Sequence, residues 1–278
     1  MNTPDSLNAN IRELQPSATL AINEECQRLQ ESGRKIFRLG FGQSPFPVPD
    51  TVVAALQNNA HQKAYLPTQG LPALRQAVAA YLQRNEQLDC DASQVMVGPG
   101  SKELMFLLQL TYEAELLLPA PTWVSYAPQA AIIGREISWL QCDLDQATGL
   151  DPQLLEQHCQ NQPGRTRLLV LNYPSNPTGN TYTADQLRAL ADVARRHRLL
   201  ILSDEIYSGL NFAGEHISIA RYYPEGTIVS NGLSKWCGAG GWRLGVFVFP
   251  RELAWLQQAM AALVTETFSA VSAPVQYA

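Results

Sequence analysis

The stretch Thr166-Arg167-Leu168-Leu169-Val170-Leu171-Asn172 decides the fold class. It is a short apolar run rich in branched residues, and a second run of the same character follows at Leu199–Asp204. Between the two runs, Thr183–His197 predicts a helix, with Thr183 and Gln186 in the positions of a capping box. A buried strand, a helix and another buried strand are typical of a parallel sheet that is covered by helices.

The same alternation extends along most of the chain. Five more short apolar runs predict strands at Gln94–Gly98, Glu115–Pro119, Glu136–Cys142, Thr227–Ser230 and Leu244–Phe249. Longer amphipathic stretches predict helices at Ser17–Ser32, Pro72–Arg84, Ser101–Tyr112, Pro152–Gln160 and Arg251–Thr265. We therefore expect an α/β fold, a three-layer sandwich with a mostly parallel seven-stranded sheet. Ligands of such sheets bind beyond the carboxyl ends of the strands.

Composition and charge narrow the range of functions. The 278 residues carry a net charge of −5 without a long basic run, so we expect no nucleic-acid partner. We find no apolar stretch of about 18 residues, so we expect no membrane span. The five cysteines are odd in number and lack C-x-x-C spacing, which favours reduced thiols in a cytoplasm. The four histidines form no H-x-x-x-H pair, so nothing in the spacing indicates a metal site.

Polar residues follow three of the predicted strands. The first segment, Asn172-Tyr173-Pro174-Ser175-Asn176-Pro177-Thr178-Gly179, is by itself most simply a turn. The second, Asp204-Glu205-Ile206-Tyr207, is by itself most simply an acidic helix cap, although it also places a carboxylate and a phenol close together. The third places Ser234 and Lys235 before a glycine-rich stretch that leads to Arg243, whose planar fork suits a phosphate.

Two further segments lie at strand ends. Gly98-Pro99-Gly100-Ser101-Lys102-Glu103 joins a predicted strand to a helix, where backbone amides bind phosphate readily. A dinucleotide-binding G-x-G-x-x-G motif is incomplete there, because position 103 is Glu. Pro119-Ala120-Pro121-Thr122-Trp123 ends in an aromatic ring that is either part of the core or stacked on a planar ligand.

In this order, the segments resemble the class I/II aminotransferases of the fold-type I pyridoxal-phosphate family. The most specific are the Asn-Pro-Thr-Gly segment, the Ser-Asp-Glu-Ile-Tyr segment and the Leu-Ser-Lys segment with its following Gly-Trp-Arg-Leu-Gly. Two N-terminal stretches also resemble the family: Leu39-Gly40-Phe41-Gly42-Gln43, and Tyr65-Leu66-Pro67-Thr68-Gln69-Gly70 with Leu74-Arg75. The resemblance extends from about Leu14 to Ala278.

The resemblance implies a role for each matching residue. Lys235 would carry pyridoxal 5′-phosphate as a Schiff base and then move the substrate proton, and Asp204 would pair with the pyridinium nitrogen. Tyr207 and Asn176 would hydrogen-bond the phenolic oxygen, and Asn176 would also touch the substrate carboxylate. The remaining implied contacts are ring stacking by Trp123, phosphate binding by Ser101, Lys102, Ser234 and Arg243, and lining of the substrate side by Gly42. Tyr65 would reach the phosphate of a neighbouring subunit, which implies a homodimer.

The sequence departs from the family pattern in two places. Many members carry a serine three residues before the lysine, where this chain has Gly232. The family also continues past the position of Ala278 into a small domain, which supplies the arginine that grips the substrate α-carboxylate. We expect an N-terminal segment at 1–45 and a cofactor-binding large domain at 46–278, with the C-terminal small domain absent.

The expected activity is transfer of an amino group between an amino acid and a 2-oxo acid. The same residues are compatible with a pyridoxal-phosphate-dependent lyase or synthase of the same fold, because the reaction type depends on contacts on the substrate side. A truncated, non-catalytic cofactor-binding protein is the alternative from a different class. A nicotinamide-binding domain explains neither Lys235 nor Arg243.

Overall fold

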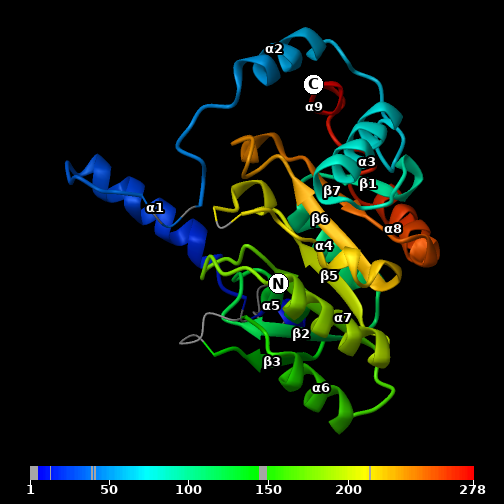
Figure 1. Ribbon diagram of the computed structural model, residues 1–278. Helices are drawn as coiled ribbons and strands as arrows, with labels where there is room; N and C mark the ends of the chain where they lie inside the picture. The colour runs from blue at the N-terminus through cyan, green and yellow to red at the C-terminus, as the bar shows by residue number, and fades with distance from the viewer. Residues whose placement is uncertain (1–5, 13, 39, 41, 144–148, 213) are drawn as a thin grey trace.

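A computed structural model describes residues 6–12, 14–38, 40, 42–143, 149–212 and 214–278. Its centre is a single sheet of seven strands in the order β1-β7-β6-β5-β4-β2-β3 (Figure 1). The strands are β1 Val95–Gly98, β2 Glu115–Ala120, β3 Ile137–Gln141, β4 Arg167–Asn172, β5 Leu200–Asp204, β6 Thr227–Gly232 and β7 Gly245–Val248. Every predicted strand is therefore confirmed, with ends that differ by at most two residues.

The helices are α1 Ala18–Glu31, α2 Asp50–Asn59, α3 Pro72–Glu86, α4 Ser101–Thr111, α5 Tyr126–Ile132, α6 Pro152–Asn161, α7 Ala184–His197, α8 Ala254–Thr265 and α9 Ala273–Tyr277. The capping box of Thr183 and Gln186 is present at the start of α7, and Pro72 and Pro152 lie in the first turns of α3 and α6. Our predictions did not give bounds for α2 or α5. The sequence shows no helical period at α5, because this helix is short and contains Pro128.

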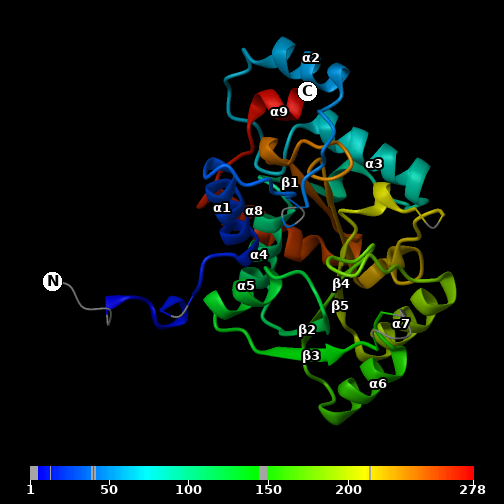
Figure 2. The same cartoon turned by 90° about the vertical axis from the view of Figure 1, so that its left-hand side faces the viewer.

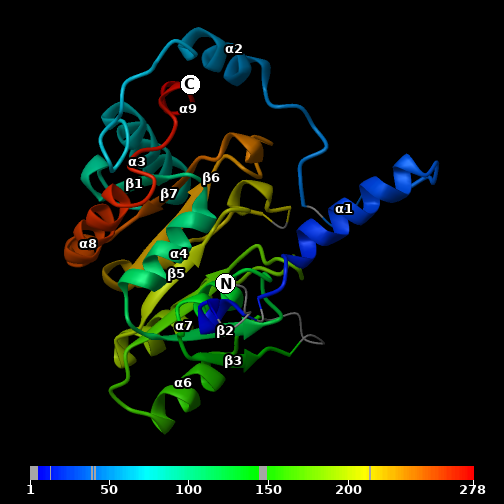
Figure 3. The same cartoon turned by 180° about the vertical axis from the view of Figure 1, so that it is seen from behind.

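Helices cover both faces of the sheet, as Figures 1 and 3 show from opposite sides. On one face, Leu104 of α4, Tyr126 of α5 and Met260 of α8 pack in one buried cluster with the strands. On the other face, Leu155 of α6 and Leu187 of α7 pack in a second cluster. A third cluster joins Leu82 of α3 to Val97 of β1 and Val246 of β7. The predicted three-layer α/β fold is thus confirmed, with the sheet held between packed layers of helices.

The direction of the strands decides where polar side chains meet. Neighbouring strands pair in parallel from β3 through β2, β4 and β5 to β6, whereas β7 is antiparallel to both β6 and β1. The start of β7 therefore lies at the same edge as the carboxyl ends of the other strands. Gly245 pairs there with both Gly98 and Gly232, which brings Arg243 beside the start of α4.

Helix α1 has no buried residue and projects away from the sheet in Figures 1 and 3, and Figure 2 views it nearly end-on. Helix α2 lies beside the C-terminal helix α9 in all three views. Within the described ranges, no helix combines the length and the apolar character that a membrane crossing requires.

Candidate active site

The carboxyl edge of the sheet surrounds a cavity of about 520 Å³. Ten of the eleven residues that the sequence singled out line it: Gly42, Ser101, Lys102, Trp123, Asn176, Asp204, Tyr207, Ser234, Lys235 and Arg243. The eleventh, Tyr65, is 94% exposed and is not in the lining. The polar residues that follow separate strands therefore converge, as the position of the strand ends requires.

Asp204 is a buried carboxylate in this cavity. It is the last residue of β5, and only 3% of its surface is exposed. Its Oδ2 accepts a hydrogen bond from Tyr126 Oη at 2.6 Å, and Ser230 Oγ lies 3.4 Å from Oδ1. Burial raises the pKa of Asp204 to about 6, although the Tyr126 hydrogen bond opposes this shift. A cationic ring nitrogen would compensate this buried charge.

Asn172 and Asn176 form an amide pair beside Asp204. Asn172 Nδ2 donates to the Asp204 backbone oxygen at 2.9 Å, and Asn172 Oδ1 accepts from Asn176 N at 2.7 Å. The Asn176 Nδ2 group in turn donates to Tyr207 Oη at 3.3 Å. The phenol and the amide therefore present adjacent polar atoms to one point of the cavity, where they can hold an oxyanion.

The amino group of Lys235 lies close to that pair. Its Nζ donates to the Gly42 backbone oxygen at 2.9 Å and lies 5.4 Å from the centroid of the Tyr207 ring. Gly42 thus reaches the cavity from the N-terminal part of the chain. Leu39 and Phe41 of the same predicted motif lie outside the described residues.

An anion-binding cup adjoins the amino group. It combines the N-terminus of α4 at Ser101 with the guanidinium of Arg243, which donates to the backbone oxygens of Gly240 at 2.8 Å and Pro99 at 3.1 Å. A Cβ at Gly100 would collide with the Arg243 guanidinium, and a Cβ at Gly245 would collide with the backbone nitrogen of Ser101. The glycines therefore allow the helix start and the arginine to approach each other, and this favours a compact anion such as phosphate.

The aromatic wall of the cavity is built by Trp123 and Tyr126, whose rings meet edge to face with centroids 5.2 Å apart. Lys102 Nζ lies 5.3 Å from the centroid of the Trp123 ring. Burial, followed by repulsion from Arg243, lowers the pKa of Lys102. Trp123 is only partly buried, so its ring can stack on a planar ligand as well as pack against the core.

Sequence reasoning assigned no role to Tyr126 or Asn172, although both line the cavity and both touch Asp204. Asn172 had a usable signal, because it ends β4 as Asp204 ends β5, and the two residues pair directly. The contact of Tyr126 depends on how α5 packs over the sheet, which no local pattern indicates.

Comparisons with known proteins agree on one family. Residues 34–278 match the family described as aminotransferase class I and II. An aspartate aminotransferase of Geobacillus stearothermophilus is 35% identical over 96% of this chain and 69% of its own length. An aspartate/prephenate aminotransferase of Thermus thermophilus is 31% identical over 98% of this chain and 70% of its own length.

A solved structure agrees with the sequence relatives. The aspartate aminotransferase from Thermus thermophilus with maleate superposes with a TM-score of 0.91 at 30% identity, and covers 98% of this chain and 71% of that one. The chain thus spans about 70% of the length of these relatives. The predicted membership in the family is confirmed by the length of the sequence match and by the close agreement of the folds. This protein belongs to the class I and II aminotransferases.

Proposed function

We propose that the cavity binds pyridoxal 5′-phosphate through Lys235, and that the chain serves the transfer of an amino group between a dicarboxylic amino acid and a 2-oxo acid. One observation carries the proposal: a buried carboxylate, a lysine amine and an anion cup face one cavity in this chain. The names of the relatives, which are aspartate and aspartate/prephenate aminotransferases, support aspartate as the first amino acid to test.

The residues present fit this cofactor at each of its polar groups. The anion cup of Ser101 and Arg243 suits its phosphate, and the buried carboxylate of Asp204 suits its ring nitrogen. The amide and phenol of Asn176 and Tyr207 suit its phenolic oxygen. When bound, pyridoxal phosphate supplies an electron-withdrawing ring that stabilises negative charge at the substrate Cα.

Four tasks would then fall to the protein's own residues. Asp204 keeps a proton on the ring nitrogen, because a buried carboxylate favours a neighbouring cation. Tyr207 and Asn176 fix the position of the ring through its oxygen. Lys235 Nζ, which lies 2.9 Å from the Gly42 backbone oxygen, would hold the cofactor covalently and would serve as the base that moves the substrate Cα proton. Trp123 covers the ring and limits the access of water.

The direct test of this function is an amino-transfer assay with the full chain, aspartate and 2-oxoglutarate. We expect glutamate to form only when pyridoxal phosphate is present. Phenylalanine in place of aspartate distinguishes dicarboxylic from aromatic preference. Release of ammonia and pyruvate from an amino acid, without a 2-oxo acid acceptor, would instead identify a lyase and contradict the proposal.

The Arg243→Lys substitution should weaken binding of the cofactor through its phosphate. It keeps the positive charge but removes the planar fork, so we expect the Kd for pyridoxal phosphate to rise about 10-fold. The Kd for pyridoxal, which lacks the phosphate, should stay within about 2-fold of the unmodified chain. Arg251→Lys, at an exposed pair with Asp91, is the matched control. An equal rise in the Kd for both ligands would show that Arg243 does not act through the phosphate.

We also propose a homodimer in which Tyr65 contacts the phosphate of the neighbouring subunit. The tyrosine is almost fully exposed and lies outside the cavity of its own chain, so it is available to a partner. Mixing Tyr65→Phe chains with Lys235→Ala chains tests this arrangement. Shared sites predict that the mixed population regains an intact site, whereas self-contained sites predict no gain.

A cytoplasmic location is proposed as well, because all five cysteines are free thiols.

A further inference from the structure

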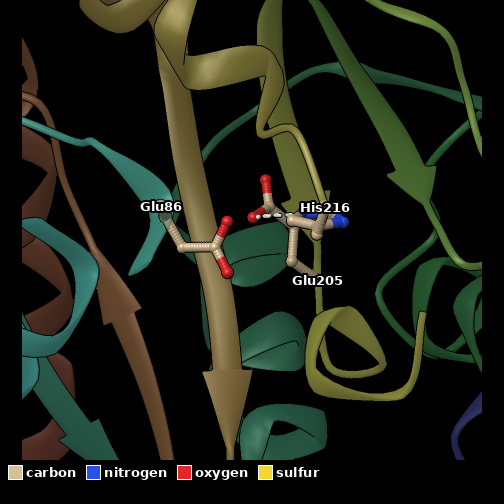
Figure 4. Close-up of side chains that lie close together, drawn as sticks. All are labelled: Glu86, Glu205 and His216. Atoms are coloured by element: carbon tan, nitrogen blue, oxygen red, sulfur yellow. Dashed lines mark hydrogen bonds and ion pairs between the residues drawn. The ribbon is translucent and has the colours of Figure 1, made fainter. Parts of the chain in front are cut away.

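Three buried side chains from distant parts of the sequence meet at a second position, away from the cavity. Glu86 ends α3, Glu205 follows β5, and His216 precedes the short 3₁₀ helix at Ile219–Arg221. Their exposed fractions are 4%, 0% and 7%, and one potential ligand atom of each lies within 4.8 Å of the others (Figure 4). None of the three lines the cavity described above. Asp204, the last residue of β5, lines that cavity, whereas the next residue, Glu205, does not.

The Glu205 carboxylate is held firmly in one orientation. Its Oε1 accepts hydrogen bonds from Ser203 Oγ at 2.7 Å and Ser218 Oγ at 2.6 Å. Its Oε2 faces His216 Nε2 at 2.9 Å. The Tyr173 ring stacks on the His216 ring at a centroid distance of 5.2 Å, which fixes the imidazole plane. Such supporting contacts are those that orient ligands around protein-bound cations.

Glu86 has no comparable partner. Its Oε2 atom is buried and accepts no hydrogen bond among the described residues, and its carboxylate points toward the other two side chains in Figure 4. The nearby Arg221 uses its Nε on the Glu86 backbone oxygen, at 2.7 Å, rather than on the carboxylate. A buried carboxylate without a donor is costly unless a cation compensates it.

We propose that Glu86, Glu205 and His216 form a site for one divalent transition-metal cation. One imidazole nitrogen and two carboxylate oxygens suit manganese, cobalt or zinc, and the two carboxylates balance the charge of the cation. Three ligand atoms that each lie about 2.1 Å from one cation are about 3.4 to 3.6 Å from one another, so a pair near the 4.8 Å limit must close by about 1 Å when the cation binds. The cation would also replace the hydrogen bond between His216 and Glu205.

The site would join three segments that the sheet does not connect directly: the end of α3, the end of β5 and the loop that carries His216. Its expected role is structural, because a cation that binds only the folded chain stabilises that state. Sequence spacing did not indicate this site, because its ligands are separated by 119 positions between Glu86 and Glu205 and lack any short motif.

Manganese is the most suitable probe, because the free thiols of this chain compete weakly for it. We expect the metal-free full chain to bind one Mn²⁺, measured by loss of the electron paramagnetic resonance signal of the free ion. Pulsed measurements on the bound ion should detect coupling to one imidazole nitrogen. Saturating Mn²⁺ should also raise the unfolding temperature.

The Glu86→Gln variant keeps the size of the side chain and should bind Mn²⁺ at least about 10-fold more weakly, as expected for loss of a charged ligand. Glu156→Gln is the matched control, because Glu156 is a partly exposed carboxylate that lies 2.8 Å from a histidine, His197 Nε2, outside the proposed site. Absence of one-to-one binding at about 1 mM, the weak end for protein cation sites, would overturn the proposal. So would bound manganese without nitrogen coupling, or equal binding by Glu86→Gln.

Discussion

Replacing Lys235 by alanine is expected to lower the rate of amino transfer by about 10⁴-fold, because the substitution removes the group that we propose as covalent anchor and proton carrier. The amine donates to Gly42 and lies beside the Tyr207 ring, whereas Lys102, which also lines the cavity, lies beside the Trp123 ring, so the two amines occupy different positions. Steady-state measurement of glutamate formation gives the magnitude. Lys63→Ala, at an exposed position, is the matched control and should retain full activity.

A second readout separates loss of chemistry from loss of folding. Small primary amines added to the Lys235→Ala variant should restore part of the rate, because they can enter the cavity and carry the proton. The recovery should follow the basicity of the added amine. Unchanged activity of Lys235→Ala would show that the lysine takes no part in the mechanism. If the variant is inactive, is not rescued by any amine and has lost its folded state, the role of Lys235 would be structural only.

Replacing Asp204 by asparagine should have opposite effects on activity and stability. The rate should fall about 10²- to 10³-fold, because the ring nitrogen loses the charge that stabilises its proton. The folded chain without cofactor should become more stable at neutral pH by up to about 3 kcal/mol. Tyr126 Oη can still donate to the amide oxygen, so the substitution removes the buried charge without leaving the phenol unpaired.

The stability effect has a defined pH range. Because folding raises the pKa of Asp204 from 3.8 to about 6, the folded chain holds this proton more tightly than the unfolded chain. Ionisation therefore opposes folding, and the destabilisation develops as pH rises from about 4 to about 6. Urea unfolding of both chains at pH 4 and pH 7.5, without cofactor, measures the difference. Parallel stability profiles, or a less stable asparagine variant at pH 7.5, would show that the carboxylate is not strained by burial.

The sheet and the cavity could be predicted from sequence for a physical reason. In an α/β fold each buried strand is a continuous apolar run, and its last residues are the polar ones that face a ligand. Asp204 and Lys235 could therefore be placed at the same edge before any contact was known. The position of Arg243 could not be derived in this way, because it depends on the antiparallel direction of β7.

Other features could not be predicted because they depend on packing between distant segments. Tyr126 reaches Asp204 only through the way α5 lies over the sheet, and α5 has a weak helical signal with Pro128 inside it. The cluster of Glu86, Glu205 and His216 forms only when the end of α3 packs beside the end of β5. Side chains without a shared local motif become neighbours through such packing, and their chemistry is visible only in the folded chain.

The most direct test of the central claim is to incubate the full chain with pyridoxal phosphate, reduce it with borohydride and map the modified peptide by mass spectrometry. The chain has only four lysines, Lys35, Lys63, Lys102 and Lys235, so the result is unambiguous. The account predicts one phosphopyridoxyl group per chain, on Lys235, and its loss in Lys235→Ala. A modification on Lys102, or one spread over the exposed lysines with none favoured, would contradict it.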